Sequence, residues 1–181
     1  MQRRGGMKHS SLAIAFLLAG STLAAADPPS AKLSDSDMSV VSELHHANQA
    51  EVEMGNYALS HGTKSVKDFA TMMVKDHSAN DTKLIAIAKK HGMTTIPVPP
   101  VDKAEMENMT KIEGMAGMEF DRAYIDAMVD GHGKVGKMVT DAIGTVADAD
   151  LKAHLTATKP VVDRHLDSAK KLQKTAAQAR N

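Results

Sequence analysis

Four long segments of this chain repeat apolar residues at intervals of three and four, the spacing that places side chains on one face of an α-helix. We predict helices over about 37–60, 64–91, 117–146 and from 148 or 150 to about 177. No segment alternates apolar and polar residues as a half-buried strand does. One-sided apolar faces on four helices can only be buried against one another, so the sequence predicts an all-α fold, a four-helix bundle.

The connections predict the order in which these helices pack. The first two helices share a short turn, as do the last two, so each pair is expected to form an antiparallel hairpin. The intervening "MTTIPVPPV" (93–101) cannot be helical, because its three prolines lack a backbone donor. A short helix is expected at about 102–113. These roughly 25 residues suffice for a crossover along the length of the bundle.

Local signals predict how individual helices begin and continue. Asp35 and Ser36 are candidate N-caps of the first helix, and Thr63 is the candidate N-cap of the second. Pro160 lies inside the last segment, where the apolar period continues on both sides of it. We therefore expect a kink at Pro160 and not a helix end.

The first 26 residues have the layout of a cleavable secretory signal. A basic start precedes an apolar run over 12–19, and small residues at 24–26 precede Asp27. The apolar run is shorter than the roughly 20 residues that span a bilayer. We expect 1–26 to be removed and the protein to be exported, with the periplasm as its location. The absence of cysteine excludes a lipoprotein anchor and disulfides.

The remaining chain suits one slightly acidic domain. Removing the three basic residues of the signal changes 22 basic against 22 acidic residues to 19 against 22. This balance disfavours nucleic acid as a partner, and the bundle uses up the apolar faces that a membrane would need. We predict a flexible leader at 27–36, one domain at 37–177 and a disordered tail at 178–181.

Each predicted helix carries one ionisable residue in the middle of its buried face. These residues are Glu51, His77, His132 and His165. A buried carboxylate without a partner is costly, and four mid-length positions in one bundle lie at similar depth. Three imidazoles and a carboxylate can satisfy a divalent metal, as ligands on facing helices do in other bundles. They can instead be separately hydrogen-bonded, and the residues leave both interpretations open.

Other polar residues are expected around this cluster. Asp76 lies about 100° around the helix from His77, where it could orient an imidazole on a neighbouring helix or act as a ligand. Asn80 and Tyr124 lie on the same inward faces and are expected in the second layer of contacts. The other histidines are predicted to lie at the surface: His45, His46, His61, His91 and His154.

Methionine is a second candidate metal ligand. The chain contains 13 methionines, among them two pairs spaced by three residues and one adjacent pair near His77. The members of these pairs are Met106 and Met109, Met115 and Met118, and Met72 and Met73. Thioethers are soft ligands that favour Cu(I). The alternative is that they fill a core that has no Trp, two Tyr and three Phe.

Three stretches resemble an exported bacterial family, domain of unknown function 4142, which is placed in the ferritin-like superfamily. They are "ANQAEVEMGNYALSHGTKSVKDFATMMVKDHSANDTKLIAIAKKHG", "EFDRAYIDAMVDGH" and "KPVVDRHLDSAKKL", and the resemblance extends over about 36–175. It implies a ferritin-like bundle, an exported location and a bacterial source. It implies little about chemistry.

The chain departs from the ferritin-like di-iron pattern. Such proteins supply a Glu from two helices and Glu-x-x-His from the other two. Here Val74 and Val162 stand three residues before His77 and His165, and His132 stands where the third helix would offer a Glu. Oxygen activation at a di-iron centre is therefore not expected. One Glu and three His suit a single Zn(II), Cu(II) or Fe(II) ion, and no organic cofactor is indicated.

Two functions remain open from the sequence. The first is an exported metal-binding bundle for storage, buffering or redox protection. The second is a non-catalytic envelope or stress protein whose buried His/Glu network is structural or senses pH, since histidine titrates near pH 6.5. A hydrolase is not indicated, because no nucleophile elbow or glycine-rich phosphate loop is present.

Overall fold

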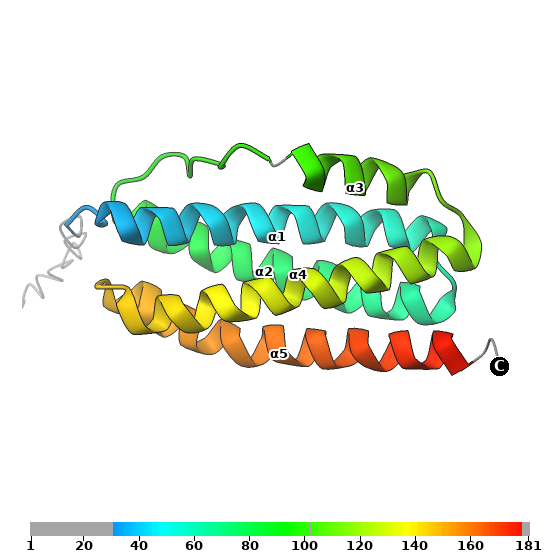
Figure 1. Cartoon of the computed structure of the whole chain (residues 1–181). Helices are drawn as coiled ribbons and strands as arrows, with labels where there is room; N and C mark the ends of the chain where they lie inside the picture. The colour runs from blue at the N-terminus through cyan, green and yellow to red at the C-terminus, as the bar shows by residue number, and fades with distance from the viewer. Residues whose placement is uncertain (1–30, 102, 179–181) are drawn as a thin grey trace, which may run out of the picture.

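The computed structural model of the chain describes residues 31–101 and 103–178. Four long helices lie side by side as a bundle, and one short helix lies outside it (Figure 1). The elements are α1 (Asp35–His61), α2 (Lys64–Lys90), α3 (Lys103–Glu113), α4 (Gly117–Thr145) and α5 (Ala149–Gln178). The described residues contain no strand. The predicted all-α fold is confirmed, and the predicted helix limits differ from these by at most two residues.

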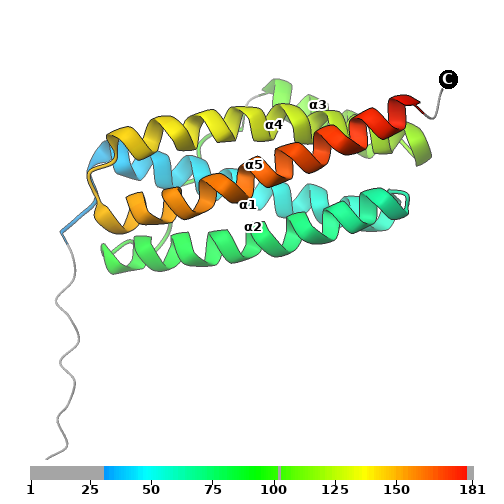
Figure 2. The same cartoon turned by 90° about the horizontal axis from the view of Figure 1, so that it is seen from below.

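The helices form two antiparallel hairpins, as the sequence predicts. α1 packs against α2 and α4 against α5, while α2 also contacts α5 and α1 contacts α4 (Figure 2). The crossover leaves α2 at one end of the bundle and reaches α4 at the other (Figure 1). α3 lies on this crossover and packs against α4. The arrangement leaves α3 as a cover over the outer side of α1 and α4.

The starts of α1 and α2 differ in how they are held. The Ser34 hydroxyl caps α1, accepting a hydrogen bond of 3.1 Å from a backbone N–H in the first turn. The prediction of Asp35 or Ser36 as the cap is wrong, because α1 begins at Asp35, about two residues before the predicted start. Thr63 does precede α2, but its hydroxyl bonds the Asp121 carboxylate of α4 at 2.5 Å. That bond joins the two hairpins.

α5 continues through Pro160, in agreement with the prediction that the proline does not end the helix. Residues on both sides of the proline face the interior: Leu155 and Thr158 before it, and Val162 and His165 after it. The uninterrupted register carries His165 into the middle of the bundle.

The bundle interior contains two apolar clusters, one toward each end. One includes Phe69, Met73, Phe120 and Tyr124. The other includes Leu44, Leu84, Val139, Leu151 and Leu155. Between them lies a layer that contains the buried polar side chains Asn48, His77, His132, Thr158 and His165.

The described residues contain no helix long and apolar enough to cross a membrane. The predicted signal segment (1–26) lies outside the described residues, as do 179–181 of the predicted tail.

Candidate metal centre

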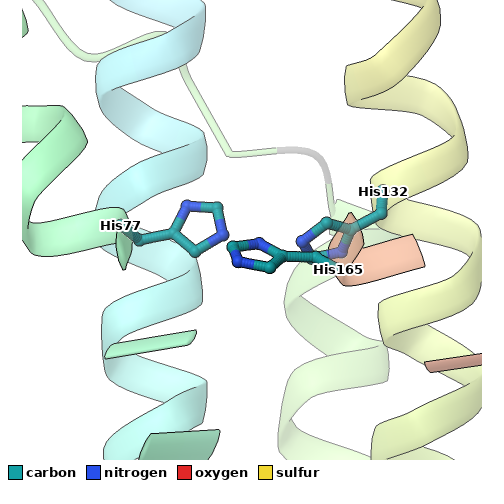
Figure 3. Close-up of side chains that lie close together, drawn as sticks. All are labelled: His77, His132 and His165. Atoms are coloured by element: carbon teal, nitrogen blue, oxygen red, sulfur yellow. The ribbon is translucent and has the colours of Figure 1, made fainter. Parts of the chain in front are cut away.

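Three histidines from three helices meet at mid-length of the bundle. His77 of α2, His132 of α4 and His165 of α5 point toward one another (Figure 3). They are 7%, 2% and 0% exposed. One ligand nitrogen from each lies within 4.8 Å of the others, and the ring centroids are 5.2–5.6 Å apart. The structure thus brings together the three histidines that the sequence singles out.

Each ring uses one nitrogen to bond an oxygen of the protein. The bonds run from His77 Nδ1 to Asn48 Oδ1 (2.9 Å), from His132 Nδ1 to the Met128 carbonyl (2.9 Å) and from His165 Nε2 to Asp76 Oδ2 (3.0 Å). These oxygens only accept hydrogen bonds, so the bonded nitrogen carries the proton. The other nitrogen of each neutral ring therefore presents a lone pair. Such outer contacts fix tautomer and orientation in metal-binding histidines.

The three remaining nitrogens are buried and have no hydrogen-bond partner among the described residues. They are His77 Nε2, His132 Nε2 and His165 Nδ1. A buried acceptor left unpaired costs about 1–3 kcal/mol. A cavity of about 20 Å³ lies beside two of the rings, His77 and His132, and has room for roughly one water-sized species. Asp76 and Glu51 also line it, and His165 does not. A cation would satisfy the three lone pairs together.

The environment keeps the rings neutral. Burial, followed by repulsion from the neighbouring rings, lowers the pKa of His77 from 6.5 to about 3. The same causes lower the pKa of His132 to about 4. Burial also lowers the pKa of His165, although its bond to Asp76 opposes the shift. The lone pairs are thus available at neutral pH.

Asp76 anchors the third ring and is itself anchored. Its Oδ2 accepts bonds from His165 and from the Arg164 guanidinium at 2.9 Å. Partial burial works to raise the pKa of Asp76, but these two partners lower it below its usual value. Asp76 is therefore a carboxylate that orients His165, one of the two roles expected for it.

A chain of hydrogen bonds sets the direction of the Asn48 amide. The Thr158 hydroxyl donates to the His154 carbonyl and accepts from Asn80 Nδ2 at 2.6 Å. Asn80 Oδ1 then accepts from Asn48 Nδ2 at 2.9 Å, which leaves Asn48 Oδ1 for His77. Asn80 thus acts on the triad through Asn48 and not directly.

Sequence reasoning missed Asn48. It stands four residues after Leu44 and three before Glu51, on the face that α1 buries. Ala47, its neighbour, fits the same inward face as an apolar residue, so the apolar period alone does not single out Asn48. An amide at a position that completes an inward i, i+4, i+7 series is the signal that could have identified it.

Glu51 lies beside the triad and not within the cluster of ligand atoms that lie within 4.8 Å of one another. Its Oε1 is 3.6 Å from His132 Nδ1, the nitrogen that already bonds Met128, and its Oε2 is buried without a partner. Burial raises the pKa of Glu51 from 4.5 to about 8. Its role as a fourth ligand stays a prediction.

Tyr124 is fully buried in one apolar cluster, where it stacks with Phe120 and meets Phe69 edge-on. Its hydroxyl has no hydrogen-bond partner among the described residues. Burial, with the Glu51 charge second, raises the Tyr124 pKa. No hydrogen bond among the described residues therefore supports the predicted place of Tyr124 next to the triad.

The methionine pairs are divided between core and solvent. Met73 is fully buried, and Met72, Met109 and Met115 pack at the edge of the same apolar cluster. Met106 and Met118 are 53% and 70% exposed. The packing of the first four methionines corresponds to core filling, whereas Met106 and Met118 do not fill the core. A soft-ligand role for all six stays a prediction.

Three histidines predicted at the surface are buried, so that prediction is wrong for them. His45 bonds Asp81 of α2 at 2.6 Å, and His91 bonds the Ala31 carbonyl at 2.6 Å. His154 is also buried. For His45 and His91, partners distant in sequence make burial tolerable, which the helical pattern of one segment cannot reveal.

Two solved structures are similar to this chain in fold. The first is described as "CopM in the Cu(I)-bound form", with a TM-score of 0.58. The second is described as "CopM in the Ag-bound form (by co-crystallization)", with a TM-score of 0.55. Each is 15% identical to this chain, and each match covers 78% of this chain and 93% of the other. At this identity the likeness shows a shared fold.

Among proteins with curated functions, none matches the chain significantly. The family defined as "Domain of unknown function (DUF4142)" matches residues 22–172, which include all four long helices up to Leu172 of α5. The chain belongs to the DUF4142 family.

Proposed function

We propose that this protein binds one transition-metal ion through His77, His132 and His165. The observation that carries the proposal is the convergence of three buried histidines, with one ligand nitrogen from each within 4.8 Å of the others and with one unpartnered nitrogen on every ring. Each of the three rings is held by a different acceptor, so the donor set is oriented before any ion binds. Glu51 and the adjacent cavity leave a position for a further ligand or water.

The charge of the site favours a monovalent ion, Cu(I) or Ag(I), over Zn(II) or Fe(II). The three rings are neutral, Asp76 is paired with Arg164, and burial favours the protonated form of Glu51. A divalent ion would be poorly compensated unless Glu51 lost its proton. Imidazole alone accepts zinc, copper and iron. The Cu(I) and Ag forms of the structural neighbours add support for copper.

The role that fits such a site is buffering of copper in an exported compartment, with redox protection as its consequence. Three imidazoles without thiolate bind through neutral donors that a chelating partner can displace. The sequence signal at 1–26 supports export to the periplasm. No feature of the triad requires a catalytic step.

The alternative is a metal-free polar network with a structural or pH-sensing role. The hydrogen-bond chain from His77 through Asn48 and Asn80 to Thr158 favours it, because it would order the core without an ion. This alternative leaves three buried nitrogens unsatisfied, and we rank it second.

Elemental analysis of the mature protein separates the two. We expect about one equivalent of copper per chain after Cu(I) loading and removal of excess. His77→Ala should abolish that equivalent, because it removes one of three donors. His61→Ala is the matched control, since His61 is exposed and bonds only its own helix at Tyr57. Equal metal content in wild type and His77→Ala would contradict the proposal.

A further inference from the structure

A second, larger cavity lies between α1, α3 and α4. Its volume is about 450 Å³. Ala50 and Met54 line it from α1, Met109 from α3, and Met128 and Gly131 from α4. Asp130 and Lys134, whose side chains are largely exposed, also line it. It is therefore a groove that opens to solvent and runs inward under α3.

The groove and the small cavity beside the triad share a wall. Glu51, Ala47 and Val135 line both of them. Of the three, only Glu51 is polar, and its Oε2 is buried without a partner. On the groove side a Cβ added at Gly131 would lie 3.7 Å from Glu51 Oε1, so the glycine leaves this face of the carboxyl group uncovered.

From these contacts we infer that the groove between α1, α3 and α4 is the route by which the metal ion reaches and leaves the triad, passing Glu51. The inference rests on the proposed function. The lining is suited to such transit: the thioethers of Met54, Met109 and Met128 are soft donors, and the Glu51 carboxyl group follows at the inner end. An ion would exchange water for these weak ligands before it meets three imidazoles.

The other sides of the triad are closed by paired groups. Toward α2 and α5, Asp76 is held by both His165 and Arg164. Toward the inner face of α1, α2 and α5, Asn48, Asn80 and Thr158 form a continuous hydrogen-bond chain. The two apolar clusters fill the directions along the bundle axis. Passage on any of these sides requires breaking hydrogen bonds or opening the core.

A single introduced thiol allows the groove to be blocked after folding. The chain has no cysteine, so Ala50→Cys in the full chain carries one thiol, at the groove. The thiol is alkylated either with iodoacetamide, a small cap, or with N-benzylmaleimide, a bulky one. Both products are thioethers, so they differ in size and not in donor type. The rates of Cu(I) loading, and of release to a chromogenic chelator, are then measured.

Ala176→Cys provides the matched control position. Ala176 lies in a separate surface depression with Arg122 and Gln173, roughly 16 Å along α5 from His165. We expect the bulky cap at residue 50 to slow loading and release by at least about tenfold, with unchanged final stoichiometry. The small cap, and both caps at residue 176, should leave the rates unchanged.

Two further variants complete the test. One blocks the groove even if the introduced thiol does not react, and the other tests entry from the Asp76 side. Gly131→Leu fills the groove without a label and should also slow both rates. Arg164→Ala opens the Asp76 side. Because it also loosens the contact that orients His165, only loading is compared, and loading should not become faster. Unaltered rates in both blocked proteins, or faster loading in Arg164→Ala alone, would overturn the inference. Failure of the unlabelled wild type to bind Cu(I) would instead overturn the proposed function, so the two failures are distinct.

Discussion

The two ends of the bundle and its middle layer are built from the same four helices but solve different problems. At the ends, the inward positions carry Leu, Phe, Val and Met, which pack into two apolar clusters. In the middle, the same helical faces carry three histidines, an asparagine and a threonine. The ends gain mainly from burial, although the Tyr124 hydroxyl in one of them has no partner among the described residues. The middle brings together three histidines that each have one unpartnered ring nitrogen. The comparison indicates that the ends hold the fold and the middle is kept for a ligand.

The largest effect on stability is expected from a substitution that creates a cavity in one of the two apolar clusters. Phe120 is fully buried in its apolar cluster, so Phe120→Ala should lower the free energy of unfolding by about 3–5 kcal/mol. The folded variant should still bind one equivalent of metal, because the triad lies outside that cluster. Denaturant unfolding and elemental analysis check both parts. A loss of metal at unchanged stability would break the division between ends and middle.

The next largest effect is expected from acidification, which should change the free energy of unfolding in one direction through the histidines and in the other through Glu51. Folding lowers the pKa of His77 to about 3 and of His132 to about 4, so the unfolded chain binds more protons below pH 6.5. Their contribution to stability is present above pH 6.5 and is lost as the pH falls toward 3. Glu51 acts in the opposite direction, because its raised pKa of about 8 adds stability below pH 4.5 that is lost as the pH rises through 8.

The variant that exposes this opposition is Glu51→Gln. Without Glu51, the metal-free protein should lose roughly 3 kcal/mol of stability between pH 7 and pH 5, while the wild type loses less. Urea unfolding at the two pH values measures the difference. Parallel pH dependence in the two proteins would show that Glu51 ionises normally in the folded state.

An intermediate effect, on metal affinity, is expected from removing a contact that orients one of the rings. Asp76→Asn keeps the shape of the side chain but removes the charge that orients His165. We expect metal affinity to fall by about 10–100-fold with one equivalent still bound at saturation. Competition with a Cu(I) chelator measures the affinity. The matched control is Asp163→Asn, because Asp163 pairs with Lys159 on the outer face of the same helix as His165. An unchanged affinity in Asp76→Asn would assign the rings' orientation to packing alone.

The smallest effect on stability is expected at the triad itself. His132→Leu removes a buried unpaired nitrogen and supplies apolar volume, and the Met128 carbonyl keeps its helical hydrogen bond. The metal-free variant should be as stable as wild type or more stable by about 1 kcal/mol, yet bind no metal. A loss of several kcal/mol would place the middle layer among the groups that hold the fold.

The sequence was sufficient for the fold and for the choice of the three histidines. Helical periodicity fixes which face each residue occupies, and helix length fixes its depth, so His77, His132 and His165 could be placed together without coordinates. Asn48 was missed because it and Ala47 both fit the inward face of α1. The proton position on each ring depends on partners such as the Met128 carbonyl, which leaves no trace in residue type.

The burial of His45 and the position of α3 were also beyond sequence reasoning. His45 is buried because Asp81 lies opposite it on α2, a pairing set by the rotation of two helices about their axes. The groove depends on where α3 rests against α4, which no periodicity in an 11-residue helix determines. Both are properties of how elements meet and not of the elements themselves.

X-ray absorption at the copper edge of the Cu(I)-loaded full chain tests the central claim most directly. The account predicts three nitrogen scatterers with the multiple-scattering pattern of imidazole, at about 2.0 Å, and no sulfur. It also predicts that this signal disappears in His77→Ala. A first shell dominated by sulfur at about 2.3 Å would place the ion on methionines and would contradict the assignment of the buried histidine triad as the metal site.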